Sequence, residues 1–314
     1  MLKVSSSLPD IAVLRGGNKN FKQSLIEGAD ILASLQKIGY DPVDVLIERD
    51  GAWTARGFPT TPHAIYTQAH TIVDTTRMKG EEYQKLAKKM NIPLVFSSDE
   101  EVTMSREDLY RVLRQQHIKV PETYVVRASA PLKAGIFREL WTRFHTPLLI
   151  RPLYRHEEMP SRIVKMFHEL EQVVREYHER GIDIHVLTYR KKPTTSIAIL
   201  PHFRREEVYT PLWVDTFPQD GSLPTPESPA RPHLQAPEFR KENMKAIATK
   251  VYKALGLQSP ACIDFINHNN EYMVVNVDCN PSLRKEGRFM QSLATTGVDA
   301  GHFIHEYILH DLER

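Results

Sequence analysis

The sequence predicts an α/β protein built from more than one compact unit. Short apolar runs alternate with helical patterns through the first hundred residues, which is the order expected for a parallel sheet covered by helices. The chain of 314 residues is also too long for one ordinary core, and its 41% hydrophobic and 25% charged residues are typical of a folded globular protein. We therefore expect two or three units that share a cleft.

The first unit is expected to span residues 1–103 and to form a Rossmann-like layer. It opens with an apolar run at Ile11–Leu14, which stops at Gly16 and Gly17 and leads into a helical pattern over Phe21–Ile38. A strand, a glycine turn and a helix in this order begin a parallel sheet. Further apolar runs lie at Val43–Ile47, Thr71–Val73 and Pro93–Phe96. One more helical pattern lies at Glu81–Met90.

A second unit is expected over residues 104–183 and a third over residues 184–314. The second begins where Ser105 and Asp108 form a helix-capping pattern. The third contains a proline-rich stretch, residues 211–237, which argues against a helix or a central strand and predicts a long ordered loop. Its other expected elements are strands at Ile184–Tyr189 and Thr195–Leu200, a helix at Glu238–Leu255, a hairpin of Ala261–Asn267 with Glu271–Asp278, and a helix at Val298–Leu312.

Charge, hydropathy and cysteine content argue against several classes of function. The 41 basic and 39 acidic residues give a formal charge of +2, so no one-signed field attracts nucleic acid or an anionic membrane. The apolar stretches stay far below the roughly 18 residues that span a bilayer, and the short polar start carries no secretion signal. Two cysteines without CxxC spacing fit neither a disulfide framework nor a zinc site. We expect a cytoplasmic protein without nucleic-acid or membrane partners.

The predicted hairpin brings oxygen-bearing side chains together. Asp264 lies on its first strand, while Asn276, Asp278 and Asn280 alternate along and just beyond the second, which places these three on one face. With a three-residue turn, Cys262 lies opposite Asn276, and Asp264 shares that face. Carboxylate and carboxamide oxygens suit Mg²⁺, which takes phosphate and water as its other ligands. The alternative is a polar hairpin that faces solvent, and the alternation alone favours that alternative.

Five segments of the chain match the motifs of one known family. They are Ile11–Gly17 and Ser24–Gly28 near the start, and Val251–Gly256, Ala261–Phe265 and Met273–Pro281 near the end. In this order they resemble the opening strand, first helix, late helix end and two metal-site strands of the D-alanine:D-alanine ligases. The resemblance covers nearly the whole chain. It implies an ATP-grasp fold with an N-terminal Rossmann-like (pre-ATP-grasp) domain, and a nucleotide held between the central and C-terminal subdomains.

The resemblance implies a reaction as well as a fold. In this family ATP phosphorylates a carboxylate and an amine attacks the acyl phosphate, while Mg²⁺ and cationic side chains stabilise the transferred phosphate. The positions that match the metal ligands are Asp264, Asn276 and Asp278. Arg106 and Arg151 match two lysines that reach the phosphates of ATP, so they keep the charge with a different geometry.

Candidate catalytic and substrate-binding residues follow from the same match. Arg151 and Ser161, the serine at the end of the segment that matches the lid loop, are the candidate catalytic residues. Asn280 and Ser282 are the candidate substrate contacts. ATP and Mg²⁺ are the implied cofactors, amino-acid-like molecules are the implied substrates, and a homodimer is expected because the ligases of this family are commonly dimers.

Several positions depart from the family pattern. The segment Arg155–Ser161 has no glycine where the family's lid is glycine-rich, and Pro160 removes a backbone donor. Leu187 and Thr188 stand where the family has a pair of acids that contact the nucleotide. Cys262 stands where it has the arginine that stabilises the oxyanion. These changes remove nucleotide contacts and one source of transition-state stabilisation.

Two functions follow from this mixture of kept and altered positions. The first is an ATP-dependent carboxylate–amine ligase, which makes D-alanyl-D-alanine for peptidoglycan or joins another pair of amino acids; the remaining acids and arginines favour it. The second is a degenerate, catalytically inactive homologue that acts as a binding or structural protein. The altered oxyanion position favours the second, because loss of one oxyanion donor costs about 10²- to 10³-fold in rate.

Overall fold

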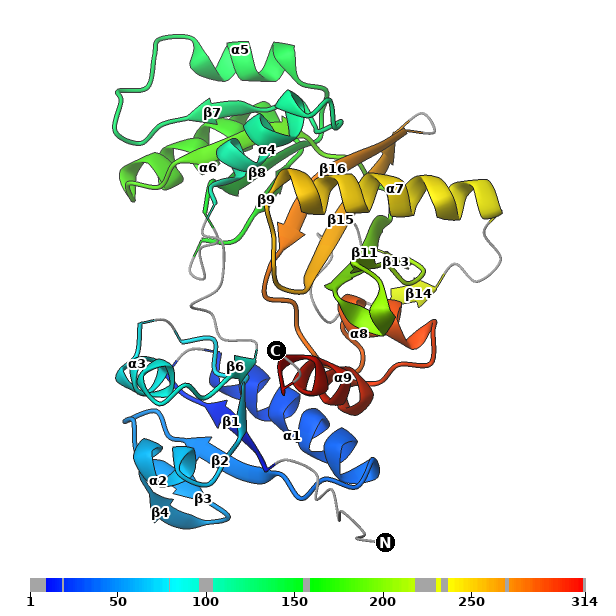
Figure 1. The fold of residues 1–314 in the computed structure, drawn as a ribbon. Helices are drawn as coiled ribbons and strands as arrows, with labels where there is room; N and C mark the ends of the chain where they lie inside the picture. The colour runs from blue at the N-terminus through cyan, green and yellow to red at the C-terminus, as the bar shows by residue number, and fades with distance from the viewer. Residues whose placement is uncertain are drawn as a thin grey trace, which may run out of the picture.

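In the part of the chain that the structure describes, three sheets follow one another in chain order (Figure 1). The computed structural model describes residues 10–18, 20–78, 80–95, 104–154, 159–217, 230–232, 237–268 and 271–312, with the side chains of the last helix described up to residue 307. The fold class is α/β, as predicted. No helix in these ranges is long and apolar enough to cross a membrane.

The first sheet is the predicted Rossmann-like layer. Its elements are β1 (Ile11–Gly16), α1 (Phe21–Lys37), β2 (Val43–Ile47), β3 (Trp53–Ala55), β4 (Phe58–Thr60), α2 (Pro62–Tyr66), β5 (Thr71–Asp74), α3 (Glu82–Lys89) and β6 (Leu94–Val95). The strands β2, β1, β5 and β6 pair in parallel, which confirms the prediction. The sequence analysis missed the β3–β4 hairpin, whose turn places Arg56 and Gly57 in the left-handed region with φ of 49° and 84°.

The second sheet is antiparallel, in the order β7-β10-β8-β9. Its elements are α4 (Arg106–Gln115), β7 (Tyr124–Val126), α5 (Ile136–Arg143), β8 (Leu148–Pro152), β9 (Arg162–Val164), α6 (Phe167–Glu179) and β10 (Ile184–Thr188). The helices α5 and α6 cover one face, where Leu140 and Val174 pack with Leu148 and Ile150 in a single core. The opposite face carries Arg151, whose guanidinium reaches the third sheet.

The strand expected to open the third unit belongs to the second sheet. β10 pairs antiparallel with both β7 and β8, so the boundary expected at residues 183/184 separates this strand from its neighbours. The change of sheet falls between Thr188 and Thr194 instead. The sheet that a strand joins is decided by its pairing with strands far apart in the chain, and a local apolar run does not reveal that pairing. The other expected boundary, at residues 103/104, adjoins residues 96–103, which lie outside the described ranges. The division into three domains stays a prediction.

The third sheet carries the predicted hairpin. Its elements are β11 (Thr194–Pro201), the short 3₁₀ helix η2 (Phe203–Arg205), β12 (Val208–Tyr209), β13 (Val214–Thr216), β14 (Ala230–Pro232), α7 (Glu238–Ala254), β15 (Ala261–His268), β16 (Glu271–Asp278), α8 (Arg288–Ala294) and α9 (Ala300–Leu312). The order is β14-β13-β11-β15-β16, with β12 paired to β11. Helix α7 packs on one face and α8 on the other.

Part of the proline-rich stretch is sheet, which corrects the prediction of a loop throughout. β13 lies between β11 and β14 and contains no proline, while β14 is an edge strand that ends in Pro232. An edge position tolerates proline, because one side of that strand needs no ladder donor. Residues 218–229 and 233–236 lie outside the described part of the chain.

The first and last helices share one hydrophobic core. Leu35 of α1 and Phe303 of α9 are fully buried in a cluster that also contains Phe289 of α8. Figure 1 shows α9 lying beside α1. The helices approach so closely that a Cβ added at Gly301 would lie 2.4 Å from the carbonyl oxygen of Ser34. The N-terminal sheet is therefore packed against the unit that carries the hairpin.

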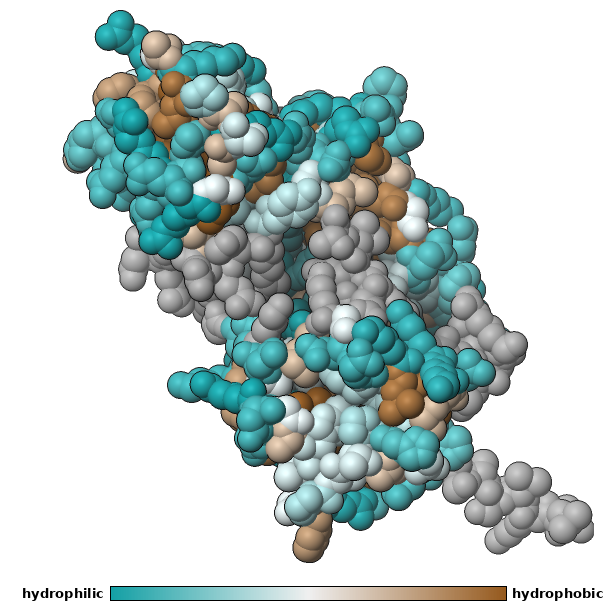
Figure 2. All heavy atoms as spheres, turned by 90° about the vertical axis from the view of Figure 1, so that its left-hand side faces the viewer, coloured by the Kyte–Doolittle hydropathy of each residue, from teal (hydrophilic) through white to brown (hydrophobic). Residues whose placement is uncertain are grey.

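Hydrophilic side chains cover most of one face of the molecule. Figure 2 shows this face, on which the apolar side chains gather in small separate areas. Most large apolar residues of the described ranges lie in the cores beside the three sheets, and the exposed ones are Ile26, Phe58, Tyr154, Met166, Phe167, Phe217 and Phe239. The described part of this face therefore offers no continuous apolar docking surface.

Candidate functional site

The hairpin brings the three predicted metal ligands together. Asp264 and Asn276 lie directly opposite each other on β15 and β16, and Cys262 lies opposite Asp278. Alternation along each strand places these residues on one face of the sheet. It is the face that α8 covers, because Cys262 is buried in the same core as α8 and Asp264 is paired with Arg288 of that helix.

The expected register was wrong by two residues, although the expected face was right. Cys262 was expected opposite Asn276. His268, expected in the turn, pairs with Glu271 and moves the register by one residue. A β-bulge at Val275 moves it by one more. A shift of one residue reverses the face that a side chain occupies, so two such shifts restore it.

The carboxylate of Asp264 is buried and engaged on both oxygens. Its side chain is only 4% exposed. Oδ1 accepts a hydrogen bond from Ser196 Oγ at 2.7 Å, and Oδ2 accepts one from Asn276 Nδ2 at 3.1 Å. Burial raises the pKa of Asp264, and the positive charge of Arg288 opposes that rise.

Arg288 lies between the two carboxylates of the hairpin. Its Nη2 is 3.2 Å from Asp264 Oδ2 and 3.5 Å from Asp278 Oδ2. The nearby carboxylate of Asp264 raises the pKa of Arg288. The sequence analysis missed this residue, because no spacing links the first residue of α8 to a hairpin that ends ten residues earlier. We call Asp264, Asp278 and Arg288 the carboxylate–arginine cluster.

Helix α8 holds Arg288 in place. Gly287 precedes the helix and donates its backbone N–H to the carbonyl of Arg284 at 2.8 Å; a Cβ here would lie 3.0 Å from that oxygen. Leu293 is fully buried against the sheet, and Ser292 Oγ donates to the carbonyl of Leu212 at 2.6 Å. The position of the guanidinium is thus fixed by a tight turn and a packed helix.

The residues of this cluster do not fit a magnesium ion in their observed arrangement. Mg²⁺ needs free oxygens at about 2.0–2.1 Å in octahedral geometry. Here the guanidinium of Arg288 fills the space between the carboxylates, and Asn276 turns its amide N–H, which is a donor, toward Asp264. Among the described residues, no three His, Cys, Asp or Glu side chains are grouped as metal ligands would be.

Arg151 lies where the second sheet meets β16. Its side chain is 8% exposed, and its Nη2 donates to the carbonyl of Val275 at 3.1 Å and to the hydroxyl of Tyr110. The Nε is buried without a hydrogen-bond partner, and no carboxylate of the described residues pairs with this arginine. The structure therefore holds a buried positive charge beside Val275, the residue before Asn276 on β16.

His185 forms a second buried polar group beside Arg151. The two residues are cross-strand partners on β10 and β8, and the imidazole stacks on Tyr110 with the ring centres 5.7 Å apart. The residue is 1% exposed, and neither ring nitrogen has a hydrogen-bond partner. Burial, and to a smaller extent the positive charge of Arg151, together lower the pKa of His185 to about 3. The ring is neutral at pH 7.

Arg106 contacts the end of β8 rather than the hairpin. It is the first residue of α4, and its Nη1 donates to the carbonyl of Pro152 at 2.8 Å. Its backbone N–H donates to the carbonyl of Leu153 at 3.0 Å. These bonds join the start of α4 to the strand that carries Arg151.

The segment that matches the lid is attached to α6 at its end. Residues 155–158 lie outside the described ranges. Met159 is buried, and the carbonyl of Pro160 accepts a hydrogen bond from the hydroxyl of Tyr177. Ser161 is half-buried just before β9, and no hydrogen bond joins it to another described residue. The structure does not bring Ser161 to the carboxylate–arginine cluster.

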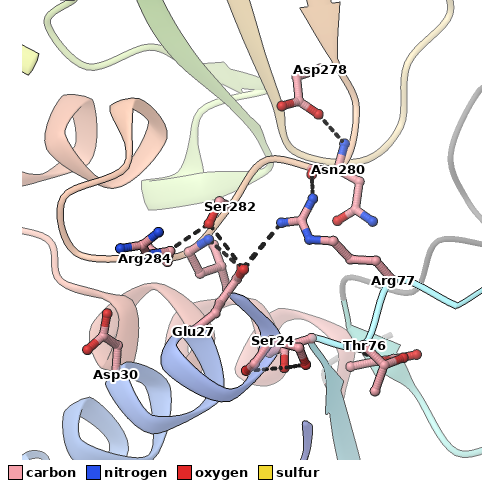
Figure 3. Close-up of polar contacts among 12 residues, drawn as sticks. Ser24, Glu27, Asp30, Thr76, Arg77, Asp278, Asn280, Ser282 and Arg284 are labelled. Carbon is pink, nitrogen blue, oxygen red and sulfur yellow. Dashed lines mark hydrogen bonds and ion pairs between the residues drawn. The ribbon is translucent and has the colours of Figure 1, made fainter. Parts of the chain in front are cut away.

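Asn280 and Ser282, the expected substrate contacts, bond to the first unit of the chain (Figure 3). Glu27 of α1 is 4% exposed; its carboxylate accepts hydrogen bonds from Ser282 Oγ at 3.1 Å and from the N–H of Leu283 at 2.7 Å. Arg77 lies 3.4 Å from Glu27 and donates to the carbonyl of Asn280 at 2.9 Å. We call this group the Glu27 cluster.

The sequence contained a signal for Glu27 but none for Arg77. Glu27 falls on the buried face of α1, with Ser24 and Ile31, and a charged residue on the buried face of a helix requires a partner. Arg77 follows β5 with a left-handed φ of 56°, which few non-glycine residues adopt. That conformation depends on its tertiary contacts, so local sequence does not predict it.

Sequence comparisons and structural comparisons give different results. No protein-family model matches the chain, and no curated protein sequence matches it. Solved structures do match it over almost their full length. The D-alanine–D-alanine ligase of Coxiella burnetii superimposes with a TM-score of 0.74 at 16% identity, covering 96% of this chain and 92% of that one.

Two further ligase structures match equally widely. The D-alanine–D-alanine ligase of Bacillus anthracis, solved in complex with ATP, has a TM-score of 0.71 at 16% identity and covers 97% of this chain and 98% of that one. The VanG D-Ala:D-Ser ligase of Enterococcus faecalis has a TM-score of 0.71 at 15% identity and covers 96% and 98%. The chain therefore has the ATP-grasp fold of the D-alanine–D-alanine ligases, as its motifs predict.

The buried imidazole makes stability depend on pH. The pKa of His185 is lowered when the chain is folded, so between pH 6.5 and about 3 the unfolded chain binds a proton that the folded protein excludes. Stability therefore falls as the pH falls through this window, by at most about 1.4 kcal/mol per pH unit. We expect His185→Phe, which keeps an aromatic ring against Tyr110, to lose this part of the acid sensitivity.

Denaturant unfolding of wild type and His185→Phe at pH 7, 6, 5 and 4 measures the effect. Other titrating groups contribute equally to both proteins and cancel in the difference. The difference in unfolding free energy should move in favour of the variant with each step toward acid. Two parallel curves would show that the folded protein accepts the proton on His185.

Proposed function

We propose that this chain binds ATP where its second sheet meets the hairpin of the third. The buried guanidinium of Arg151 carries the proposal. A buried charge without an opposite charge is unfavourable by several kcal/mol, because burial removes its hydration. Arg151 has no carboxylate partner among the described residues and keeps one N–H without an acceptor. A phosphate group would supply both the charge and the acceptor.

His185 supports a ligand at the same place. The neutral imidazole has one donor and one acceptor, and both ring nitrogens lack partners. Leaving such buried groups without partners costs about 1–3 kcal/mol each. A polar ligand that entered beside Arg151 and uncovered these nitrogens would satisfy them. The fold supports ATP as that ligand, because a structure of the same fold has been solved in complex with ATP.

A second candidate function is ATP-dependent carboxylate–amine ligation of amino-acid-like substrates. The meeting of Asp264, Asn276 and Asp278 on one face of the hairpin favours it, because the resemblance assigns these positions to the metal site. Under this candidate Mg²⁺ would be the second cofactor, and the protein would work in the cytoplasm as a homodimer, like the ligases it resembles. The arrangement of Arg288 opposes it.

Substitution of Arg151 tests the nucleotide site. Arg151→Met removes a charge that has no carboxylate partner, so the variant without ligand should melt at the wild-type temperature or above it. The carbonyl of Val275 keeps its hydrogen bond from Tyr110 at 2.9 Å. ATP should raise the melting temperature of wild type but not of the variant, since a ligand at 100 times its Kd stabilises by about 2.7 kcal/mol.

Arg162→Met is the matched control for this experiment. Arg162 lies on β9, the neighbouring strand, but its guanidinium makes two hydrogen bonds to Glu176 of α6, at 2.7 and 3.1 Å. The control should melt earlier than wild type and keep its response to ATP. An equal response to ATP in wild type and Arg151→Met would remove Arg151 from the site, and no response in wild type would reject the proposed function.

An assay for ligation separates the two candidates. With ATP, Mg²⁺ and D-alanine, we expect no D-alanyl-D-alanine above the level of a protein-free control, because Cys262 replaces the oxyanion arginine and Arg288 lies between the acids. Mass spectrometry of the products, repeated with pools of other amino acids, makes the measurement. Turnover on the order of 1–10³ s⁻¹ with any pair would establish the ligase.

A further inference from the structure

We propose that Arg288 is a resident cation that takes the place of the divalent metal ion at Asp264 and Asp278. The protein therefore binds no Mg²⁺ at these carboxylates and binds nucleotide without it. The claim that no Mg²⁺ binds at these carboxylates rests on the carboxylate–arginine cluster alone. The nucleotide part of the proposal rests on the proposed function, and the two parts are measured separately.

Geometry is the first support. One nitrogen, Nη2 of Arg288, lies 3.2 Å from Asp264 Oδ2 and 3.5 Å from Asp278 Oδ2. A Mg²⁺ ion that bridges the same oxygens would lie about 2.0–2.1 Å from each, in the space that this nitrogen fills. The guanidinium and the metal ion therefore exclude each other.

The hydrogen bonds around the cluster favour the same assignment. Oδ1 of Asp264 already accepts from Ser196 Oγ at 2.7 Å, and Oδ1 of Asp278 faces the backbone N–H of Asn280 at 3.3 Å. Asn276 presents its N–H to Asp264, whereas a metal ligand would present its oxygen. Each of these groups is arranged for carboxylates paired with an arginine.

Charge and packing complete the case. Two carboxylates and one guanidinium leave a net charge of −1, and the positive charge of Arg288 offsets the cost of burying Asp264. Cys262 lies opposite Asp278 on the same face and is fully buried. The resemblance places an arginine at this position, and a second guanidinium on this face would lie beside Arg288 with like charge. The small cysteine leaves room for the resident cation.

Removal of Arg288 should create a metal site. The full-length protein, freed of metal with EDTA and without nucleotide, is titrated with Mn²⁺ while the electron paramagnetic resonance signal of free Mn²⁺ is followed. We expect Arg288→Ala to bind Mn²⁺ at least tenfold more tightly than wild type. Addition of Asp278→Asn to this variant should abolish the gain, because it removes one of the two carboxylates.

Arg284→Ala is the matched control, since it removes a guanidinium from the same loop. Figure 3 shows the Arg284 side chain turned away from Asp278. The control should bind Mn²⁺ as weakly as wild type. If Arg288→Ala does not fold, Arg288→Gln takes its place, because glutamine keeps hydrogen-bonding groups near the carboxylates but has no charge.

Each outcome decides the proposal. A gain in Arg288→Ala that is lost with Asp278→Asn supports it. Binding of Mn²⁺ by wild type that Asp278→Asn removes overturns it, and so does the absence of binding in both wild type and the Arg288 variants, which would show that the carboxylates hold no metal with or without the arginine.

Nucleotide binding by wild type gives an independent measurement. The affinity for ATP by calorimetry should agree within twofold in Mg²⁺ and in EDTA. Affinity tenfold higher in Mg²⁺ would overturn the nucleotide part of the proposal. If no ATP binds under either condition, the proposed function and this nucleotide part fail together, and the Mn²⁺ titration still decides the role of Arg288.

Discussion

A buried carboxylate that needs a compensating charge is the constraint on which this site depends. At an effective dielectric constant of 20, two unit charges 4 Å apart interact by about 4 kcal/mol, which is comparable to the cost of burying one of them. Asp74, at the end of β5, is buried just as deeply, and its carboxylate accepts hydrogen bonds from Thr76, Tyr83 and Gln84. Asp264 combines neutral donors with a cation from α8. The site thus needs β11, β15, β16 and α8 at once, and the packing of the third sheet holds the guanidinium beside the buried carboxylate.

The loop from Asn280 to Gly287 connects this cluster to the rest of the molecule. At its start Asn280 and Ser282 bond to Arg77 and Glu27 in the first unit, and at its end α8 begins with Arg288. The same two units are packed together by the core that α1, α8 and α9 share. Arg288 therefore follows a loop whose start is held by buried polar contacts to the first unit, and it begins a helix that is held by apolar packing. A side chain held in this way loses little conformational entropy when it pairs with the carboxylates.

The sequence predicted what depends on local pattern and family motifs. The four parallel strands and the helices α1 and α3 of the Rossmann-like layer, and the common face of Asp264 and Asn276, follow from periodicity, while the ATP-grasp fold follows from the order of the motifs. Pairing between distant segments was beyond local pattern. It placed β10 in the second sheet and brought Arg288 to the hairpin. The bulge at Val275 is local to the hairpin, but the alternation of side chains gave no sign of it. The altered positions Cys262 and Thr188 showed that the site had changed, but only the structure shows what stands in the place expected for the metal.

The central claim is that a guanidinium, and not a metal ion, lies between Asp264 and Asp278. A crystal structure of wild type grown with ATP and Mn²⁺ tests it directly, because manganese scatters anomalously and arginine does not. The account predicts density for the Arg288 side chain between the two carboxylates, without an anomalous peak there, and density for phosphate near Arg151. An anomalous peak bridging Asp264 and Asp278, with Arg288 displaced from them, would contradict it.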